Sequence, residues 1–287
     1  MSQTSRTGAY ADPVEDLAGK TYLVTGGNTG IGLETVRRLA ARGATVYLAG
    51  RSEERTRAVI DQLGTGRFLR LDLGDLSSVR GCAETFLATG EPLHGLINNA
   101  GLAGRRGRTP SGFEVMFGTN HVGPFLLTRL LLDRLRESAP ARIVNVASEA
   151  HRNAPGIDFA AVRQPTKSLT GMREYAVSKL ANVLHAQELA RRLEGAGVNS
   201  YALHPGVVAS DIWRRVPWPV RPLIKLRMLT PEQGAQTTLY CATSPEVADE
   251  TGQYYDRQRR REPGPAATPE LAATLWDHSE SWVAEQL

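Results

Sequence analysis

Residues 25–32 have the sequence Thr-Gly-Gly-Asn-Thr-Gly-Ile-Gly and lie between an expected strand, Thr21–Thr25, and an expected amphipathic helix, Gly30–Ala41. Gly26, Gly30 and Gly32 allow a tight turn and a close approach of the backbone to a pyrophosphate. The free N–H groups at the start of the helix, together with its dipole, favour an anion there. A plain glycine-rich turn is the alternative, but the flanking strand and helix favour a dinucleotide site. Its expected contacts are Gly26, Asn28, Thr29, Gly30 and Ile31.

Short β-rich runs alternate with long amphipathic runs through the rest of the chain. This alternation predicts an α/β fold, a Rossmann-type doubly wound parallel sheet of about seven strands with helices on both faces. Ligands of such a sheet bind at the carboxyl ends of its strands, where the strand order reverses. The further strands are expected at 44–49, 67–71, 93–97, 142–147, 198–204 and 253–255. The further helices are expected at 53–63, 77–88, 119–136, 174–194 and 230–242.

The bulk composition is that of a soluble globular protein, because 41% of the 287 residues are hydrophobic and 22% are charged. We expect a flexible N-terminal segment at 1–18, one domain at 19–287, and a second flexible, polar segment at 262–268. No apolar run approaches the roughly 20 residues of a membrane span. Cys82 and Cys241 lack metal-ligand spacing and fit a reducing compartment. The chain is therefore predicted to be cytoplasmic, without an integral membrane segment and without a metal site.

The net charge of +4 is concentrated in two arginine clusters, one at 105–108 and one at 257–261. Such clusters occur in proteins that bind nucleic acids. These two have no interleaved aromatic residues, and no nucleic-acid-binding motif accompanies them. We therefore expect solvated surface or anchors for an anionic ligand, and no nucleic-acid partner.

The end of the second expected strand bears on the choice of cofactor. NAD-selective sites place an acidic residue there, where it binds the adenosine ribose hydroxyls. This chain has Gly50 at that place, followed by Arg51, which suits a 2′-phosphate, and Ser52, which adds a hydroxyl donor. An ordinary helix-start residue is the alternative for Arg51, but the three together favour NADP(H). After the third strand, Asp72 either accepts from the adenine amino group or caps the helix that begins near Asp75.

Tyr175 and Lys179 are four residues apart in a predicted helix, so their side chains lie on one face. An ammonium group beside a phenol favours the phenolate and lowers the phenol pKa from about 10. The tyrosine then exchanges a proton with a substrate oxygen near neutral pH. Ser148 ends the fifth strand, at the edge where a ligand should bind, and its hydroxyl can hold the same oxygen. Most Tyr-x-x-x-Lys pairs are plain helix surface, but this pair follows both the glycine turn and the strand-end serine.

With its motifs in this order, the chain strongly resembles the short-chain dehydrogenase/reductase family over about residues 19–256. The motifs are Thr25-Gly-x-x-x-Gly-x-Gly32, Asp72-Leu73, Asn98-Asn-Ala-Gly101, Asn120, Ser148, Tyr175-x-x-x-Lys179 and Pro205-Gly206. Two stretches, 113–128 and 178–182, are most similar to the retinol-dehydrogenase-like branch. The long interval of 27 residues between Ser148 and Tyr175 is typical of the same branch.

The resemblance implies a role for each matched residue. Tyr175 would be the general acid or base, and Lys179 would lower its pKa and hold the nicotinamide ribose. Ser148 would orient the substrate carbonyl, and Asn120 would tie a water to Lys179 and complete a proton relay. The remaining cofactor contacts would come from Leu73, Asn99, Ala100, Gly101, Pro205, Gly206, Val207 and Ser210.

The chain departs from the family pattern at three matched positions. Ser210 stands where threonine is usual, and it keeps a hydroxyl for the nicotinamide carboxamide. Ala147-Ser148 replaces the usual serine pair at the end of the fifth strand and leaves the second hydroxyl in place. Pro124 stands where relatives of this branch often have histidine.

Together these observations predict an NADP(H)-dependent carbonyl reductase or alcohol dehydrogenase, with reduction the favoured direction. Its substrate would be a small apolar ketone, aldehyde or secondary alcohol, bound among the variable segments 103–112, 149–173 and 211–229. The last segment mixes bulky apolar and basic residues and is predicted to be a lid. A membrane-surface segment and packing filler are the alternatives for it. His151 either contacts the substrate or is a satisfied loop residue.

Two other functions are weighed against this one. A non-catalytic NADP(H)-binding redox sensor is the alternative, but such proteins usually lose the tyrosine or the lysine. An epimerase or dehydratase would need a sugar-nucleotide domain and a shorter glycine spacing, and the sequence has neither. Relatives imply a homodimer or homotetramer built on the two longest predicted helices, although the branch also contains monomers. Trp276 and Trp282 are expected to pack a terminal helix onto the domain, and His121 and His204 are expected to be structural.

Overall fold

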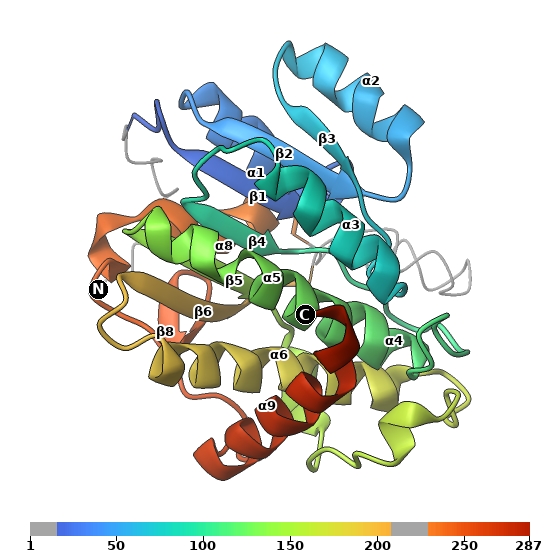
Figure 1. The fold of residues 1–287 in the computed structure, drawn as a ribbon. Coiled ribbons are helices and arrows are strands. Elements are labelled where there is room, and N and C mark those ends of the chain that lie inside the picture. Colours follow the sequence, from blue (N-terminus) through green and yellow to red (C-terminus); the bar gives the residue numbers. More distant parts are fainter. Residues whose placement is uncertain (1–15, 208–228) are drawn as a thin grey trace, which may run out of the picture.

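The computed structural model describes residues 16–207 and 229–287, which form one eight-stranded sheet with helices packed against it (Figure 1). The strands are β1 (Thr21–Thr25), β2 (Thr45–Gly50), β3 (Arg67–Arg70), β4 (Gly95–Asn98), β5 (Ala141–Val146), β6 (Val198–His204), β7 (Gln253–Asp256) and β8 (Arg259–Arg261). Their order is β3-β2-β1-β4-β5-β6-β7-β8, and every neighbouring pair is parallel except β7 and β8. The order reverses between β1 and β4, which places a ligand crevice at the carboxyl ends of these two strands.

Helices cover both faces of this sheet, as the alternation of strands and helices predicts. They are α1 (Gly30–Ala41), α2 (Glu53–Leu63), α3 (Leu76–Leu87), α4 (Val115–Phe117), α5 (Gly123–Glu137), α6 (Met172–Arg192), α8 (Pro231–Thr243) and α9 (Pro269–Val283). One buried cluster joins the sheet to α3, α5, α6 and α9, and a second joins it to α1, α2 and α8. Leu23 belongs to the first cluster and Val24 to the second, because successive side chains of a strand point to opposite faces. The predicted doubly wound α/β fold is confirmed.

The strand β8 is an element that the sequence analysis does not predict. It runs antiparallel to β7 and extends the sheet beyond the seven strands expected. The two strands are connected by Arg257 and Gln258, whose φ angles of 50° and 61° lie in the left-handed region that tight hairpin turns use. The segment 262–268, for which the composition predicts flexibility, leads from β8 into α9 and includes the buried Gly264.

The terminal helix α9 packs along α6 (Figure 1). Its side chains also contact α5. Trp276 meets Phe125 edge to face, with ring centroids 5.0 Å apart, and Arg129 on α5 forms an ion pair with Glu280. Trp282 packs edge to face against aromatic rings near α4. The predicted packing of both tryptophans against the domain is therefore confirmed. In this chain α9 packs against α5 and α6, the two long helices on which relatives imply that a dimer or tetramer forms.

Two histidine rings, His121 and His185, are buried beneath α9 next to Phe125 and Trp276. Burial lowers the pKa of His121 well below its usual value of 6.5 and lowers that of His185 to about 3. Both rings are therefore neutral in the folded protein, whereas in the unfolded chain they bind protons below about pH 6.5.

We expect the free energy of unfolding to fall as the pH drops below about 6.5, because only the unfolded chain then gains protons on these two rings. The loss is about 1.4 kcal/mol per pH unit for each fully buried ring. Urea unfolding at several values between about pH 5 and pH 7 measures it. His185→Phe keeps an aromatic ring in place and should remove one ring's share of the slope. A slope equal to that of the unmodified protein would contradict the assignment.

The start of the predicted flexible N-terminal segment lies outside the described residues, and the boundary at residue 18 stays a prediction. Leu17 is buried, and its N–H donates to the Arg42 carbonyl at 2.7 Å. Among residues 16–207 and 229–287, no helix is both long enough and apolar enough to cross a membrane. In the same part of the chain, no three His, Cys, Asp or Glu side chains gather in a way that would hold a metal ion.

Candidate active site

The glycine turn between β1 and α1 has the geometry that a dinucleotide needs. Gly26 and Gly30 have φ angles of 68° and 54°, a region that favours glycine. A Cβ atom on Gly32 would lie 2.3 Å from the Gly26 carbonyl oxygen and 2.5 Å from Asn99 Nδ2, so only glycine allows this approach. Thr29 precedes α1 without capping it through its side chain, which leaves the first helical N–H groups for a ligand.

A cavity of about 710 Å³ opens beside this turn, a volume typical of cofactor pockets. Most of the cofactor contacts predicted from the sequence line it, namely Gly26, Asn28, Thr29, Gly30, Ile31, Arg51, Ser52, Asp72, Leu73, Asn99, Ala100 and Gly101. Polar lining residues that the sequence analysis does not predict include Arg55, Arg108, Thr109 and Thr119. The structure therefore brings the dispersed glycine, arginine and asparagine motifs into one cavity.

Two arginines that follow β2, Arg51 and Arg55, line this cavity. Gly50 leaves space there, because the nearest atom to an added Cβ would be Thr56 Oγ1 at 3.9 Å. Arg51 is exposed, and Ser52 caps α2 by accepting a hydrogen bond from the Arg55 N–H at 3.4 Å. Arg55 lies four residues after Arg51 and lines the same cavity. Arg55 lies in the first turn of α2, shortly after the strand end, and that position is the sequence signal that would have identified the second arginine.

Two aspartates after β3 have separate roles. The carboxylate of Asp75 accepts from the Ser77 N–H at 3.0 Å and caps α3. Asp72 is half-buried, accepts from the Gly74 N–H at 3.0 Å and lines the cavity. Asp75, and not Asp72, is therefore the helix cap. Of the two roles that the sequence leaves open for Asp72, the contact with adenine remains.

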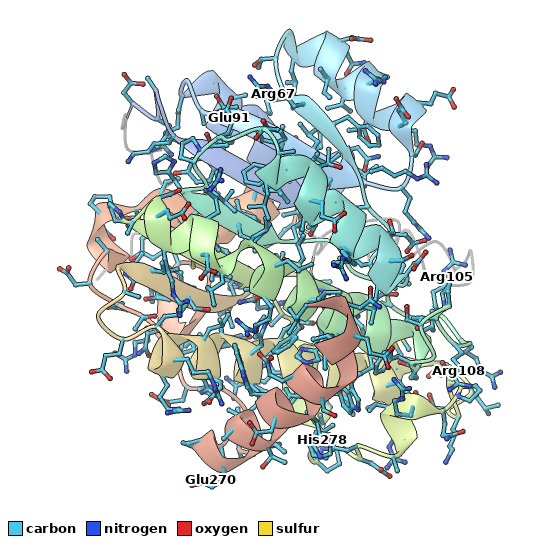
Figure 2. The ribbon with its side chains drawn as sticks, in the orientation of Figure 1. Arg67, Glu91, Arg105, Arg108, Glu270 and His278 are labelled. Atoms are coloured by element: carbon cyan, nitrogen blue, oxygen red, sulfur yellow. The ribbon has the colours of Figure 1, made fainter. Side chains whose placement is uncertain are left out.

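The first arginine cluster lies on the loop between β4 and α4, where Figure 2 labels Arg105 and Arg108. Arg105, Arg106 and Arg108 are all exposed, and Arg108 also lines the cavity. The second cluster is exposed as well, with three of its members forming β8. Within the described part of the chain, Arg108 is therefore the one member of the two clusters that lines the cavity expected to hold an anionic ligand.

Asn99 and Ala100 are fixed by Thr25 at the point where the strand order reverses. The N–H groups of both residues donate to Thr25 Oγ1 at 3.0 Å, and Asn99 Nδ2 donates to the Thr25 carbonyl at 2.9 Å. These bonds hold the backbone after β4 against the end of β1. The asparagine thus supports the floor of the cavity as well as lining it.

Ser148 and Tyr175 meet near the carboxyl end of β5. Ser148 lies two residues beyond Val146, the last residue of β5, and Tyr175 lies in the first turn of α6. Burial raises the pKa of Tyr175 above its usual value of 10.0, and a hydrogen bond with the Ser148 side chain opposes that shift. The phenol is therefore protonated at neutral pH.

Lys179 lies one helical turn after Tyr175, with Nζ 5.7 Å from the centroid of the phenol ring. Its ammonium group donates to the Val146 carbonyl at 2.8 Å, and burial lowers its pKa to about 8. The expectation that this ammonium brings the Tyr175 pKa below its usual value is wrong for this geometry. Burial raises the pKa of the phenol, and the ammonium group is directed at the strand carbonyl.

Asn120 lies in a π-helical turn, Gly118–Val122, between α4 and α5. Its Oδ1 accepts from the Leu102 N–H at 2.7 Å, and its Nδ2 donates to the Leu102 carbonyl at 2.9 Å. A Cβ atom on Gly101 would lie 3.2 Å from Asn120 Oδ1 and 3.3 Å from Lys179 Nζ, so both side chains border one small space. Turns of this kind frequently occur at functional sites.

Three predicted contacts to the nicotinamide follow β6 at the same edge of the sheet, namely Pro205, Gly206 and Val207. Gly206 has a φ angle of 86°, and a Cβ atom there would lie 2.2 Å from Leu229 Cδ1. The Leu229 N–H donates to the Val207 carbonyl at 2.8 Å. Ser210 and the predicted lid at 211–229, except for Leu229, lie outside the described residues.

Comparison with known proteins agrees with these motifs. Residues 20–218 match the family model of the short chain dehydrogenases. Dehydrogenase/reductase SDR family member 13 of Bos taurus is 46% identical over 276 residues, which cover 92% of this chain and 73% of that protein. Retinol dehydrogenase 11 of Homo sapiens is 44% identical over 274 residues, which cover 92% of this chain and 85% of that protein.

Solved structures show the same fold. An uncharacterised protein from Mycobacterium paratuberculosis superposes with a TM-score of 0.76 at 33% identity, covering 94% of this chain and 95% of that one. The NADP active-site complex of RhlG from Pseudomonas aeruginosa superposes with a TM-score of 0.69 at 26% identity, covering 90% of this chain and all of that one. The chain therefore belongs to the short-chain dehydrogenase/reductase family, and its relatives include retinol dehydrogenases.

Proposed function

We propose that this oxidoreductase is an NADP(H)-dependent carbonyl reductase or alcohol dehydrogenase acting on an apolar ketone, aldehyde or secondary alcohol. One observation carries the proposal: the hydroxyls of Ser148 and Tyr175 meet beside Lys179, near the carboxyl end of β5. Gly101 lines the dinucleotide cavity, and a Cβ atom on it would lie 3.3 Å from Lys179 Nζ. The proton-transfer groups and the cavity are thus adjacent.

The residues around the cavity fit NADP(H). The glycine turn and the start of α1 would hold the pyrophosphate. Arg51 and Arg55 would pair with the 2′-phosphate, and Gly50 offers no carboxylate to repel it. Asp72 would accept from the adenine amino group. When bound, the nicotinamide supplies or accepts the hydride.

The protein groups then account for the proton. In the reductive direction, Tyr175 donates its phenolic proton to the carbonyl oxygen as negative charge develops there. The raised pKa of Tyr175 keeps this acid form populated at neutral pH. Ser148 holds the same oxygen, which limits its motion toward the acid. Lys179, with a pKa of about 8, returns a proton to the phenolate, and Asn120 borders the space beside it.

Gly50→Asp should shift the cofactor preference from NADPH toward NADH. The new carboxylate would repel a 2′-phosphate and accept from the ribose hydroxyls, and the backbone leaves space for it. We expect KM for NADPH to rise about 10- to 100-fold, the equivalent of one like-charge contact. Steady-state kinetics with both cofactors measures the change. Gly81→Asp is the control, because it adds the same charge at an exposed position of α3, and it should leave both KM values unchanged. An unaltered cofactor preference in Gly50→Asp would contradict the 2′-phosphate site.

An apolar substrate is supported by the surroundings of Tyr175 and by the relatives. Leu169, Met172 and Val207 are exposed apolar side chains. Met172 is the first residue of α6, in the turn that carries Tyr175, and Leu169 shortly precedes this helix. Relatives at 42–46% identity include proteins named retinol dehydrogenase. The lid assigned to 211–229 and the cytoplasmic location stay predictions.

A non-catalytic NADP(H)-binding redox sensor is the second candidate. It would use the same cavity, but it would not need the Ser148–Tyr175 contact or a lysine buried beside it. Turnover of a carbonyl substrate separates the two candidates. A dimer or tetramer through α5 and α6 would have to accommodate α9, so we propose that self-association, where it occurs, uses another face.

A further inference from the structure

Ser148 is held in place by contacts from outside the sheet. The residue before Ser148 is still bonded to β6, because the Ala147 N–H donates to the Leu203 carbonyl at 2.8 Å. Beyond that point the Ser148 carbonyl accepts two hydrogen bonds, one from the His151 N–H at 3.0 Å and one from His151 Nδ1 at 2.7 Å. The Ser148 side chain accepts from the Ala150 N–H at 3.3 Å, which leaves its own hydroxyl proton for another acceptor.

The other ring nitrogen of His151 is also engaged. His151 Nε2 accepts from the Gly264 N–H at 2.8 Å, so this nitrogen carries no proton and the proton is on Nδ1. The ring is fully buried and lies edge to face against Tyr254, with centroids 4.8 Å apart. Burial lowers the pKa of His151 and keeps the ring neutral. Of the two possibilities that the sequence leaves open, His151 is the satisfied residue and not a substrate contact.

The segment after β8 is shaped to make this bond. A Cβ atom on Gly264 would lie 3.0 Å from Arg152 Cα and 3.4 Å from His151 Cδ2, so the backbone at 264 lies directly against the turn that follows Ser148. Arg152 also donates to the Glu262 carbonyl at 2.5 Å. The ring thus connects two segments of the chain that are more than a hundred residues apart.

We propose that His151 is the positioning residue for Ser148, through a neutral ring that bonds the Ser148 carbonyl on one side and the Gly264 N–H on the other. The inference rests on the proposed function, in which the Ser148 hydroxyl holds the substrate oxygen. With its carbonyl accepting from both the backbone and the ring of His151, Ser148 has a fixed peptide plane, and its hydroxyl keeps one direction toward Tyr175. A displacement of about 1 Å at such a group costs roughly a hundredfold in rate.

A double-mutant cycle tests the inference, with NADPH and whichever of retinal, a fatty aldehyde and a steroid ketone the unmodified enzyme reduces fastest. His151→Phe keeps a ring against Tyr254 but removes both hydrogen bonds. We expect kcat to fall about 10- to 100-fold, with the NADPH dissociation constant unchanged. In a Ser148→Ala background the same substitution should change kcat less than about twofold, because there is no hydroxyl left to position. His151→Asn keeps a donor at the place of Nδ1 and should recover most of the loss.

The outcomes separate this inference from the proposed function. Suppose that Ser148→Ala loses activity and that His151→Phe lowers kcat by the same factor in the Ser148→Ala background as in the unmodified enzyme. The inference then fails and the proposed function stands. If Ser148→Ala has no effect, both fail. His185→Phe makes the same change in a buried ring under α9 and should leave kcat unchanged. His151→Gln, which has no donor at the Nδ1 position, replaces the phenylalanine variant if that variant does not fold.

A second measurement does not depend on turnover. Nitrogen-15 NMR of the imidazole rings should find His151 neutral at about pH 7, with its proton on Nδ1. A protonated ring, or a proton on Nε2, would overturn the inference even if the assay found no substrate.

Discussion

Tyr175→Phe lowers kcat about a thousandfold while leaving the affinity for NADPH unchanged; this is the largest effect that we expect from a single substitution in this chain. The substitution removes only the phenolic oxygen, which is the proton donor to the substrate in the proposed reaction. The phenol is half-buried, and desolvation raises its pKa, so it is protonated at neutral pH and acts as an acid. The loss should therefore fall on the chemical step.

Single-turnover kinetics with enzyme-bound NADPH measures that step directly, and fluorescence titration of NADPH measures binding. Tyr47→Phe is the matched control, because it removes a buried phenolic oxygen that bonds Arg67 at 2.7 Å in the middle of β2, away from the strand ends. We expect its kcat to equal that of the unmodified enzyme. A Tyr175→Phe enzyme with unchanged kcat would rule out the assigned acid.

Gly32→Ala should weaken NADPH binding about 5- to 150-fold. The added methyl would lie 2.3 Å from the Gly26 carbonyl oxygen and 2.5 Å from Asn99 Nδ2. The first of these atoms is backbone, so the clash is relieved only if the turn that holds the pyrophosphate moves. Overpacking of this kind costs about 1–3 kcal/mol, and here that cost falls on the binding geometry.

Gly81→Ala is the control for this substitution, because Gly81 is exposed on α3 and an added methyl there meets no atom within 4 Å. It should leave NADPH binding unchanged and raise the free energy of unfolding by about 0.5–1 kcal/mol, since alanine favours a helix over glycine. Isothermal titration of NADPH and urea unfolding measure the two quantities. Tight NADPH binding by a folded Gly32→Ala variant would show that the turn is not the pyrophosphate site.

Most of the fold is predictable from the sequence because each segment carries a local signal. The strands are apolar on both faces, the helices are amphipathic, and the connecting turns contain glycine. The hairpin before β8 lacks such a signal, because Arg257 and Gln258 adopt positive φ angles that usually indicate glycine or asparagine. The strand itself is Arg-Arg-Arg, which reads as solvated surface, and only its pairing with β7 makes it a strand.

The site residues are predictable from the order of the motifs, whereas their electrostatics are not. Spacing alone places Tyr175 and Lys179 on one face of a helix, but it says nothing of how deeply each is buried. Burial raises the pKa of Tyr175 and lowers that of Lys179 to about 8, which reverses the expectation for the phenol. The part played by His151 depends on Gly264, whose approach requires the whole sheet and the unpredicted β8.

The consumption of NADPH by the purified enzyme, followed with a panel of retinal, a fatty aldehyde and a steroid ketone, tests the central claim most directly. We expect reduction of at least one of these carbonyl compounds with NADPH, a much lower rate with NADH, and loss of the NADPH-dependent rate in Tyr175→Phe. Tight NADPH binding without turnover of any carbonyl, or of the corresponding alcohols with NADP⁺, would contradict the claim and favour the redox sensor.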